Sequence, residues 1–251
     1  TKKENLGTFK TSDERLNRLY ENIRWSQCAN MLSVPTDCPQ REKAGWTGDV
    51  VVYGATALYN QNMTAFYEDW LRSIRLDQLE NGYVLGTVPQ IRNYVQQGDT
   101  GSLGWGDVIL TLPLQLYQLY GDKEVLQANY EAMEEWMQSM ERAAHELPSE
   151  AVPYGGSQTE QNCDERSLEN QRYLINTGFH FGDWIIPSVV NEEGFTDGPA
   201  SAFLTMNYVG SSLLAADADM FSEISELVGN MENAEKYCAY ANRVRQAFEE
   251  E

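Results

Sequence analysis

The stretch GWGDVILTLPLQLYQLYG, residues 104–121, decides the class of fold. After its Gly-Asp pair the residues are mostly apolar, without the alternation of polar and apolar positions that marks a half-buried strand. A helix that is apolar nearly all round is typical of a protein interior. Pro113 must then lie in the first turns of this helix or kink it. Such an inner helix needs other helices around it.

Amphipathic segments alternate along the chain with apolar ones. The apolar segments are residues 49–60, 104–121 and 199–230, and the amphipathic ones are residues 63–79, 122–146 and 232–251. In the amphipathic segments large apolar side chains recur at helical spacing, as in Phe66, Trp70 and Ile74. This alternation predicts inner helices buried on all sides and outer helices with one wet face. We therefore expect an all-α fold, an (α/α)6 toroid of helical hairpins, with a plain helix bundle as the alternative.

The first helix is expected in residues 15–31, after a capping box formed by Thr11 and Glu14. Its apolar side chains fall on one stripe, made by Leu16, Leu19, Tyr20 and Ile23. Towards the other end of the chain, residues 199–230 read as a long helix with a buried first half. Gly210 argues against one unbroken helix there.

About seven helices result, with long connectors at residues 81–104 and 146–178. Seven helices do not complete the six pairs of a closed toroid. The chain also stops on a helix at three consecutive Glu residues, without a Gly cap. We therefore expect residues 1–251 to be part of a single domain, the N-terminal portion of a barrel that is incomplete in this chain. No linker marks a second domain.

Composition limits the partners. The chain has 251 residues, of which 42% are apolar, and a formal net charge of −20. Its apolar content supports a real core, whereas its charge repels phosphate backbones and anionic membrane surfaces. No apolar stretch approaches the roughly 18 residues that a membrane helix needs. Nucleic acid and membranes are therefore not expected as partners, and a neutral substrate is compatible with the charge.

The cysteines indicate no metal site. Cys28, Cys38, Cys163 and Cys238 form no CxxC pair, and the chain has only two His residues. Neither a zinc site nor another cofactor is expected. Scattered cysteines slightly favour a reducing, cytoplasmic compartment. Nothing in the sequence determines the oligomeric state.

A Gly-Asp pair next to an aromatic residue and followed by an apolar run occurs three times. The pairs are Gly48–Asp49, Gly106–Asp107 and Gly182–Asp183, accompanied by Trp46, Trp105 and Trp184. Any one of these Asp residues taken alone is best explained as a helix cap. Because the inner helices of a toroid start on the same face, three such pairs would converge on one rim. Indole rings beside carboxylates suit a sugar, whereas Trp25, Trp70 and Trp136 lie on helical stripes and are expected in the core.

The first of these pairs closes the motif DCPQREKAGWTGD, residues 37–49. This motif closely resembles the DCPQRE–GWxGD signature of bacterial α-L-rhamnosidases of glycoside hydrolase family 78. The similarity continues through residues 104–122, through GFHFGDW at residues 178–184, and to the end of the chain. It covers most of the chain from about residue 10 onward, apart from an insert at residues 146–178.

The resemblance implies an (α/α)6 catalytic domain that hydrolyses terminal α-L-rhamnosides with inversion. It implies that Glu42 is the general acid. Asp37 and Asp49 would bind and orient the rhamnose hydroxyls, with Arg41 in support. The remaining substrate-binding residues that it implies are Trp46, Trp105, Asp107, Asp183 and Trp184.

The chemistry of Glu42 can be argued from the residues themselves. A general acid must hold its proton near neutral pH, and neighbouring carboxylates or an apolar ring raise the pKa of a carboxyl group. Asp37 and Asp49 supply the carboxylates, and Trp46 supplies the ring. Arg41 would oppose them if it faced the same pocket. Without the resemblance, a capping or salt-bridging role for Glu42 is preferred.

The main departure from the family pattern concerns the second catalytic carboxylate, the general base. The family's general base is a Glu in the later part of the barrel, and this chain shows no counterpart in a similar motif. The loops contain Glu160, Glu165, Glu169, Glu192 and Glu193, none of them in such a motif. An inverting enzyme needs a second carboxylate roughly 6.5–9.5 Å from the acid. The isolated chain is therefore expected to be inactive or nearly so.

Two other functions stay open. One is a non-catalytic carbohydrate-binding or scaffold module derived from such a barrel, although retention of Glu42 favours an enzyme. The other is a different toroid chemistry, either another glycosidase or a lyase. Lyases use Tyr, His or Lys on acidic substrates, so the two His residues and the net charge of −20 count against a lyase.

Overall fold

The computed structural model describes residues 5–91, 101–147 and 164–251. This part of the chain forms eight helices, which are α1 Glu14–Asn30, α2 Thr47–Asn60, α3 Thr64–Asp77, α4 Val108–Tyr120, α5 Glu124–His145, α6 Glu165–Gln171, α7 Gly198–Val228 and α8 Met231–Glu250. Strand pairing in it is limited to isolated bridges. The predicted all-α class is confirmed.

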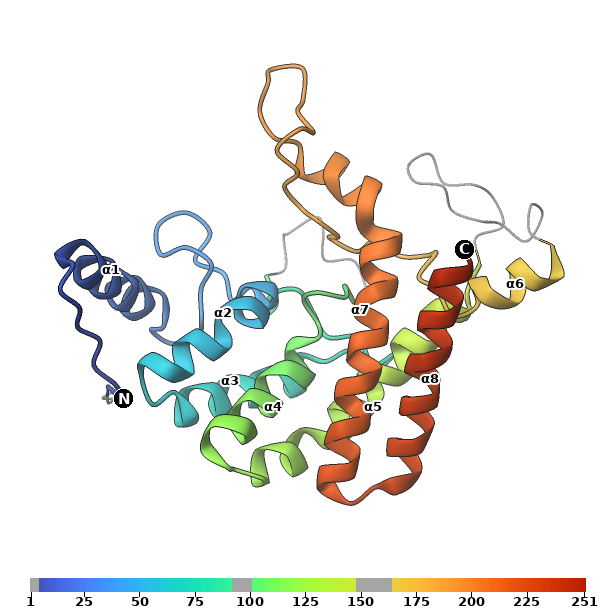
Figure 1. Ribbon diagram of the computed structural model, residues 1–251, viewed down its shortest axis with the longest axis horizontal. Helices are drawn as coiled ribbons and strands as arrows, with labels where there is room; N and C mark the ends of the chain where they lie inside the picture. The colour runs from blue at the N-terminus through green and yellow to red at the C-terminus, as the bar shows by residue number, and fades with distance from the viewer. Residues whose placement is uncertain (1–4, 92–100, 148–163) are drawn as a thin grey trace.

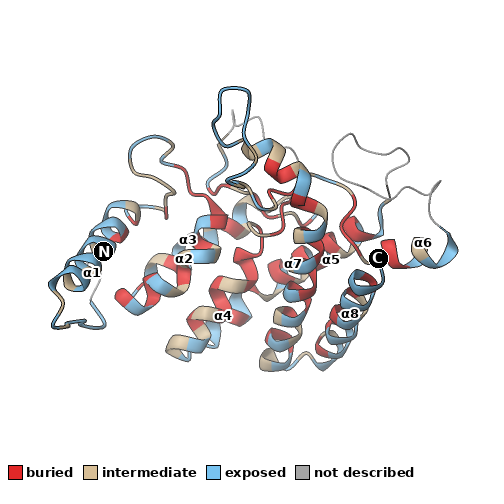
Figure 2. Cartoon of the chain, turned by 45° about the horizontal axis from the view of Figure 1, so that its top comes forward, coloured by how far each residue is buried: buried red, intermediate tan, exposed pale blue. Residues whose placement is uncertain are grey.

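Consecutive helices form the hairpins α4–α5 and α7–α8, and α2 and α3, which follow one another in the chain, both pack against α4 (Figure 1). Helix α4 packs against α2 on one side and α7 on the other, and α5 covers α4 and α7 from outside. The inner helices are therefore α2, α4 and α7, as the apolar segments predict. The arrangement is that of a helical hairpin toroid, and Figure 2 shows it as an arc with α1 at one end and α6, beside α8, at the other.

The core lies between the two layers. Trp70 of α3 and Trp136 of α5 are buried, as predicted, and so is the apolar face of α5 with Met133 and Met137. Burial of a large apolar side chain contributes about 1.5–3 kcal/mol to folding. Pro113 lies inside α4 and is buried with it. These contacts fix the inner helices, whose N-terminal ends carry two of the Gly-Asp pairs.

Helix α1 differs from its prediction. Its N-cap is Asp13, whose carboxylate accepts the backbone N–H of Arg15, so the capping box of Thr11 and Glu14 is wrong. The apolar stripe is exposed, and Gln27 is the buried residue of the helix. Trp25 is 74% exposed, which also contradicts its predicted place in the core. An amphipathic pattern shows which face can be buried, and here no other described helix covers that face.

Helices α2 and α7 are covered on fewer sides than expected. In α2, Val52 is 81% exposed, where the helix faces α1 across an open groove. Helix α7 continues unbroken through Gly210, where a Cβ would lie 3.3 Å from the Ile175 side chain. Its buried positions run along its whole length, and Leu204 and Tyr208 in its first half are exposed. The prediction of a buried first half is therefore wrong.

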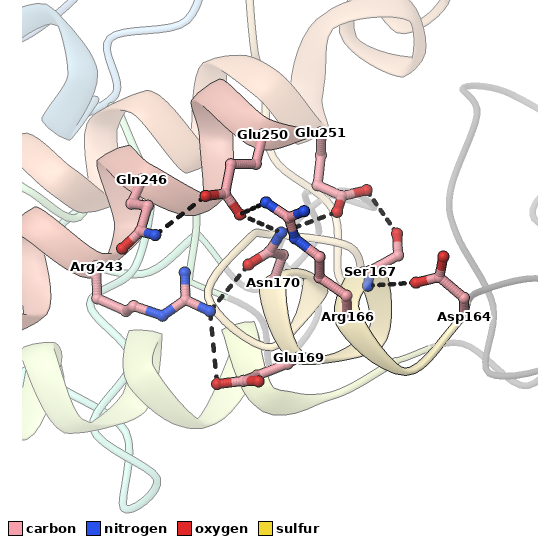
Figure 3. Close-up of polar contacts among 9 residues, drawn as sticks. All are labelled: Asp164, Arg166, Ser167, Glu169, Asn170, Arg243, Gln246, Glu250 and Glu251. Atoms are coloured by element: carbon pink, nitrogen blue, oxygen red, sulfur yellow. Dashed lines mark hydrogen bonds and ion pairs between the residues drawn. The ribbon is translucent and has the colours of Figure 1, made fainter.

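The connector at residues 146–178 contains the short helix α6, which the sequence analysis does not predict. Figure 3 shows α6 tied to the last turn of α8. Arg166 forms an ion pair with Glu250, and the Asn170 side-chain amide donates to the same carboxylate at 3.0 Å. Polar pairing holds α6 in place, which an apolar pattern cannot reveal.

Three further findings concern the described residues. None of their helices has the length and apolar character needed to cross a membrane. Cys28, Cys38 and Cys238 are free thiols. Cys163 and Glu160, together with residues 92–100 of the first connector, lie outside the described residues.

Candidate functional site

The motif at residues 37–49 forms a tight loop closed by its own backbone. The N–H of Asp37 donates to Ala44 O, and the Ala44 N–H returns a bond to Asp37 Oδ1 at 3.3 Å. The Lys43 N–H donates to Cys38 O, and Lys43 takes a left-handed conformation with φ of 55°. Inside this turn the Glu42 N–H donates to Cys38 Sγ at 3.2 Å. The turn brings the Asp37 and Glu42 side chains to the same side.

The end of the loop docks on the first connector. The Val88 N–H donates to Gly45 O at 2.9 Å, and the Thr47 N–H donates to Gly86 O at 2.9 Å. A Cβ on Gly45 would lie 2.0 Å from Val88 O, so this approach requires glycine. The contact fixes Trp46 and the first turn of α2 relative to the connector.

Glu42 is half-buried and accepts two strong hydrogen bonds. Arg41 Nη2 donates to Glu42 Oε1 at 2.5 Å, and Trp46 Nε1 donates to Glu42 Oε2 at 2.7 Å. Trp46 thus turns its polar N–H towards Glu42. The sequence predicts the opposite arrangement, in which the apolar face of the ring lies against the carboxyl group. Arg41 does face Glu42, although 83% of its side chain is exposed.

Asp49 stands in the first turn of α2, at the edge of the same loop. Burial of its carboxyl group raises its pKa to about 6, and the neighbouring carboxylates of Asp37 and Glu42 add to the rise. The residue as a whole is nevertheless exposed to solvent. Three carboxyl groups thus meet at this loop, and the raised pKa of Asp49 lets that group hold a proton in mildly acidic solution.

The three predicted tryptophans gather around one ring, that of Phe181. The Trp105 ring lies 4.2 Å from it at 33°, Trp184 at 5.3 Å and 78°, and Trp46 at 5.8 Å and 82°, measured between centroids. Edge-to-face and tilted contacts of this kind are favourable. Phe181 is missed by the sequence analysis, although it stands in the quoted motif at residues 178–184.

Phe181 is placed by bonds between two loops. Its N–H donates to Ser102 Oγ at 3.1 Å, and the Leu103 N–H donates to His180 Nδ1 at 3.1 Å. His180 is buried, and desolvation lowers its pKa to about 4, so the ring is neutral at pH 7. Trp105 follows directly in the loop that these bonds hold. The second and third repeats are therefore joined through backbone and side-chain bonds.

The third repeat does not start a helix. Asp183 is exposed, and its backbone N–H donates to Thr205 Oγ1 at 2.8 Å. Helix α7 begins only at Gly198, with Asp197 as its N-cap. The expectation that each Gly-Asp pair opens an inner helix holds for the first two pairs and is wrong for the third, because the apolar run after Trp184 is a loop.

Asp107 faces the core. It is 2% exposed, stands at the N-cap position of α4, and accepts the Gly104 N–H on Oδ2 at 2.8 Å. A carboxylate buried in this way cannot reach a ligand at the surface. The structure therefore does not support Asp107 as a direct contact to the sugar.

A groove of about 520 Å³ lies between α1 and α2 and reaches the loop carboxylates. Asp37 and Asp49 border it, and Ile23 and Val52 are among the apolar residues along it. The groove gives two of the three carboxyl groups access to solvent from the α1 side.

Asp37, Cys38 and Glu42 are the described residues that could hold a metal ion, with one ligand atom each within 4.8 Å of the others. Both Glu42 oxygens already accept hydrogen bonds from Arg41 and Trp46. A mixture of carboxylates and one thiol suits neither a hard nor a soft cation well. The chemistry of these donors therefore favours no particular metal.

Comparison with known proteins identifies similar chains. Residues 4–251 match the model of the bacterial alpha-L-rhamnosidase 6 hairpin glycosidase domain. The chain is 33% identical over 244 residues to an alpha-L-rhamnosidase of Formosa agariphila, covering 97% of this chain and 22% of that protein. It is 28% identical to an alpha-L-rhamnosidase of Alteromonas sp., again over 97% of this chain and 23% of the relative.

Solved structures agree. The alpha-L-rhamnosidase of Aspergillus terreus superposes with a TM-score of 0.76 at 27% identity, over 100% of this chain and 25% of that one. The Streptomyces avermitilis alpha-L-rhamnosidase complexed with L-rhamnose gives 0.73 at 28% identity, over 99% of this chain and 20% of the other. The chain thus spans a quarter or less of the length of these four relatives.

Proposed function

Because this chain belongs to the bacterial alpha-L-rhamnosidase six-hairpin glycosidase domain family, we propose that it supplies the acid half of an active site that hydrolyses terminal α-L-rhamnosides. The observation that carries the proposal is the placement of Glu42. It sits beside Asp37, near Asp49, with the tryptophan cluster next to it. The complex of the Streptomyces relative with L-rhamnose supports the choice of sugar.

Each residue then has a role. Glu42 donates its proton to the glycosidic oxygen as the bond from that oxygen to the anomeric carbon breaks. Asp37 and Asp49 accept hydrogen bonds from rhamnose hydroxyls. Trp46, Trp105 and Trp184 pack on the C–H face of the ring, and Asp183 contacts the sugar at the edge of the site. Arg41 is exposed, so an incoming sugar can displace it from Glu42.

Inversion requires a water molecule on the opposite face of the sugar and a base that takes its proton. The ligand oxygens of Asp37 and Glu42 lie within 4.8 Å of one another, closer than the roughly 6.5–9.5 Å of an inverting pair. Among the described alternatives, Glu169 forms an ion pair with Arg243 on the side of α6. We therefore place the general base outside the described residues.

Replacement of Glu42 by Gln tests the acid role, in a rhamnosidase-active protein that carries this chain. Loss of general acid catalysis costs about 10²–10⁴ in rate. We expect a loss of this size on α-L-rhamnosides with poor leaving groups and a much smaller one on activated aryl rhamnosides. The matched control is Glu131→Gln on the exposed face of α5. Unchanged hydrolysis of poor-leaving-group substrates by Glu42→Gln would rule out this assignment.

A further inference from the structure

We infer that Asp107 and Asp217 share one proton in the protein interior, and that this acid–carboxylate pair positions Trp105 in the aromatic wall of the site. The consequence for sugar binding rests on the proposed function, whereas the shared proton does not. Neither Asp217 nor such a pair follows from the sequence, because the two residues are far apart along the chain.

The two carboxyl groups are buried together. Asp107 is 2% exposed and Asp217 of α7 is 0% exposed, and they lie within hydrogen-bonding reach of one another. Each uses one oxygen to accept a fixed N–H, from Gly104 for Asp107 and from Trp136 Nε1 for Asp217, the latter at 3.0 Å. The Oδ1 atom of each is buried and accepts no N–H from the described residues. A proton held between the two carboxyl groups would give these oxygens a hydrogen bond.

Repulsion between the two buried carboxylates also requires a shared proton. Two ionised carboxylates side by side in a dry interior repel each other and lose their hydration, so one takes up a proton. The groups that face the pair from the described chain are the N–H donors of Gly104 and Trp136, with no basic side chain among them. Burial raises the pKa of Asp107 to about 7, and burial together with the charge of Asp107 raises the pKa of Asp217 well above its ordinary value. The pair titrates as a unit.

The pair is connected to the site through Trp136. The indole that donates to Asp217 also lies against the loop that carries Trp105, since a Cβ on Gly106 would stand 2.3 Å from its ring. On the other side of that loop, Trp105 packs so closely under α2 that a Cβ on Gly48 would stand 2.6 Å from it. Movement of the buried end of this loop therefore moves Trp105.

Three variants of the chain separate positioning from simple packing. Asp217→Asn keeps the shape, accepts the Trp136 N–H and donates an amide N–H to Asp107, so it replaces the shared proton with a fixed one. Asp217→Leu fills the space without either bond. Asp219→Asn, on the exposed side of α7, is the matched control.

The first measurement is infrared difference spectroscopy of the carboxylic acid C=O stretch. We expect the wild-type chain and Asp219→Asn, just above pH 7 where Asp49 is ionised, to show the band of one buried acid, which disappears as the pH rises through the second titration step of the pair. Asp217→Asn should lack the band. A wild type without it, or a band that survives in both Asp217→Asn and Asp107→Asn, would overturn the shared proton.

The second measurement is L-rhamnose affinity from pH 5 to 9, with near-ultraviolet circular dichroism as a readout of the tryptophans. Wild-type affinity should fall about tenfold as the pair loses its proton, the size of one lost aromatic contact of about 1.4 kcal/mol. Asp217→Asn should bind tightly and lose this pH dependence, whereas Asp217→Leu should bind weakly at every pH. Equal affinity and equal dichroism in all variants would overturn the positioning role.

These measurements distinguish failure of the proposed function from failure of the shared-proton proposal. If the wild type binds no rhamnose while the acid band and the variant-dependent dichroism are present, the proposed substrate is wrong and the proton-sharing pair stands. If rhamnose binds but the band is absent, the pair is wrong and the proposed function stands.

Discussion

Glu42 shows how the chemistry of one residue depends on its immediate neighbours. The motif at residues 37–49 predicts which side chains belong to the site, because the residue types and their spacing are readable directly. It does not predict that Trp46 turns its N–H towards Glu42 or that Arg41 does the same, because those directions come from the turn at Lys43 and the docking of Gly45. If Glu42 is the general acid, as proposed, the incoming sugar must free it from Arg41.

Asp37→Asn should lower the pKa of Asp49 from about 6 towards its ordinary value. Desolvation is the largest cause of the raised pKa and stays in place, but the repulsion by the Asp37 carboxylate disappears. Carboxyl ¹³C chemical shifts followed from pH 3 to 8 measure the change. The matched control is Asp69→Asn on the exposed side of α3, which should leave Asp49 unchanged. An equal shift in both variants would contradict the assigned cause.

At the scale of elements, the helices were predictable where an apolar face is buried by its own neighbours. This holds for α3, α4 and α5, whose periodicity matches their burial. The prediction fails for α6, because polar contacts and not an apolar face hold that helix in place. It also fails for the residues after Trp184, which are apolar but not helical. The gathering of three tryptophans around Phe181 depends on bonds between loops, and these leave no periodic signal.

Gly45→Ala should destabilise the contact between the motif loop and the first connector. Its Cβ would stand 2.0 Å from Val88 O, a backbone atom that cannot rotate away. We expect the free energy of unfolding to drop by about 1–3 kcal/mol, the cost of overpacking. Gly7→Ala is the control, since a Cβ there meets nothing within 4 Å. Chemical denaturation measures both, and equal stability of the two variants would contradict the close approach.

His180 should make stability depend on pH. Its folded-state pKa of about 4 lies below its ordinary value of 6.5, so the unfolded chain binds the proton more readily between these values. Its contribution is therefore fully present above pH 6.5 and is lost as pH falls towards 4. We expect a loss of about 3 kcal/mol from this residue. His180→Asn retains an acceptor for the Leu103 N–H and should flatten the slope in urea titrations, whereas His145→Asn on the exposed end of α5 should not.

At the scale of the whole molecule, the arc of helices places Glu42, the neighbouring carboxyl groups and the tryptophans near one another. The alternation of apolar and amphipathic segments predicts this architecture, because it fixes which helices lie inside. It overstates the burial of α2 and α1, since the pattern shows which face can be covered and not what covers it. Conversely, the buried Asp107–Asp217 pair arises only when α4 and α7 are packed together.

The isolated 251-residue chain should bind L-rhamnose and hydrolyse α-L-rhamnosides poorly. The proposed acid and sugar contacts lie among the described residues, whereas the proposed base lies outside them. Calorimetry with L-rhamnose and an assay with an aryl α-L-rhamnoside test the two parts separately. We expect turnover at least about 10²-fold below that of active relatives, the smaller end of the effect of a missing acid or base. Turnover equal to theirs would show that a carboxylate in this chain already acts as the base.

The exposed stripe of α1 has a consequence for the behaviour of many copies in solution. Leu16, Leu19 and Ile23 form an exposed apolar face, while the net charge of −20 makes the copies repel one another. The reach of that repulsion is about 10 Å in 0.1 M salt and about 3 Å in 1 M salt. Added salt therefore lets two such faces approach to contact distance, so the salt content of the buffer sets whether this chain is dispersed or clustered.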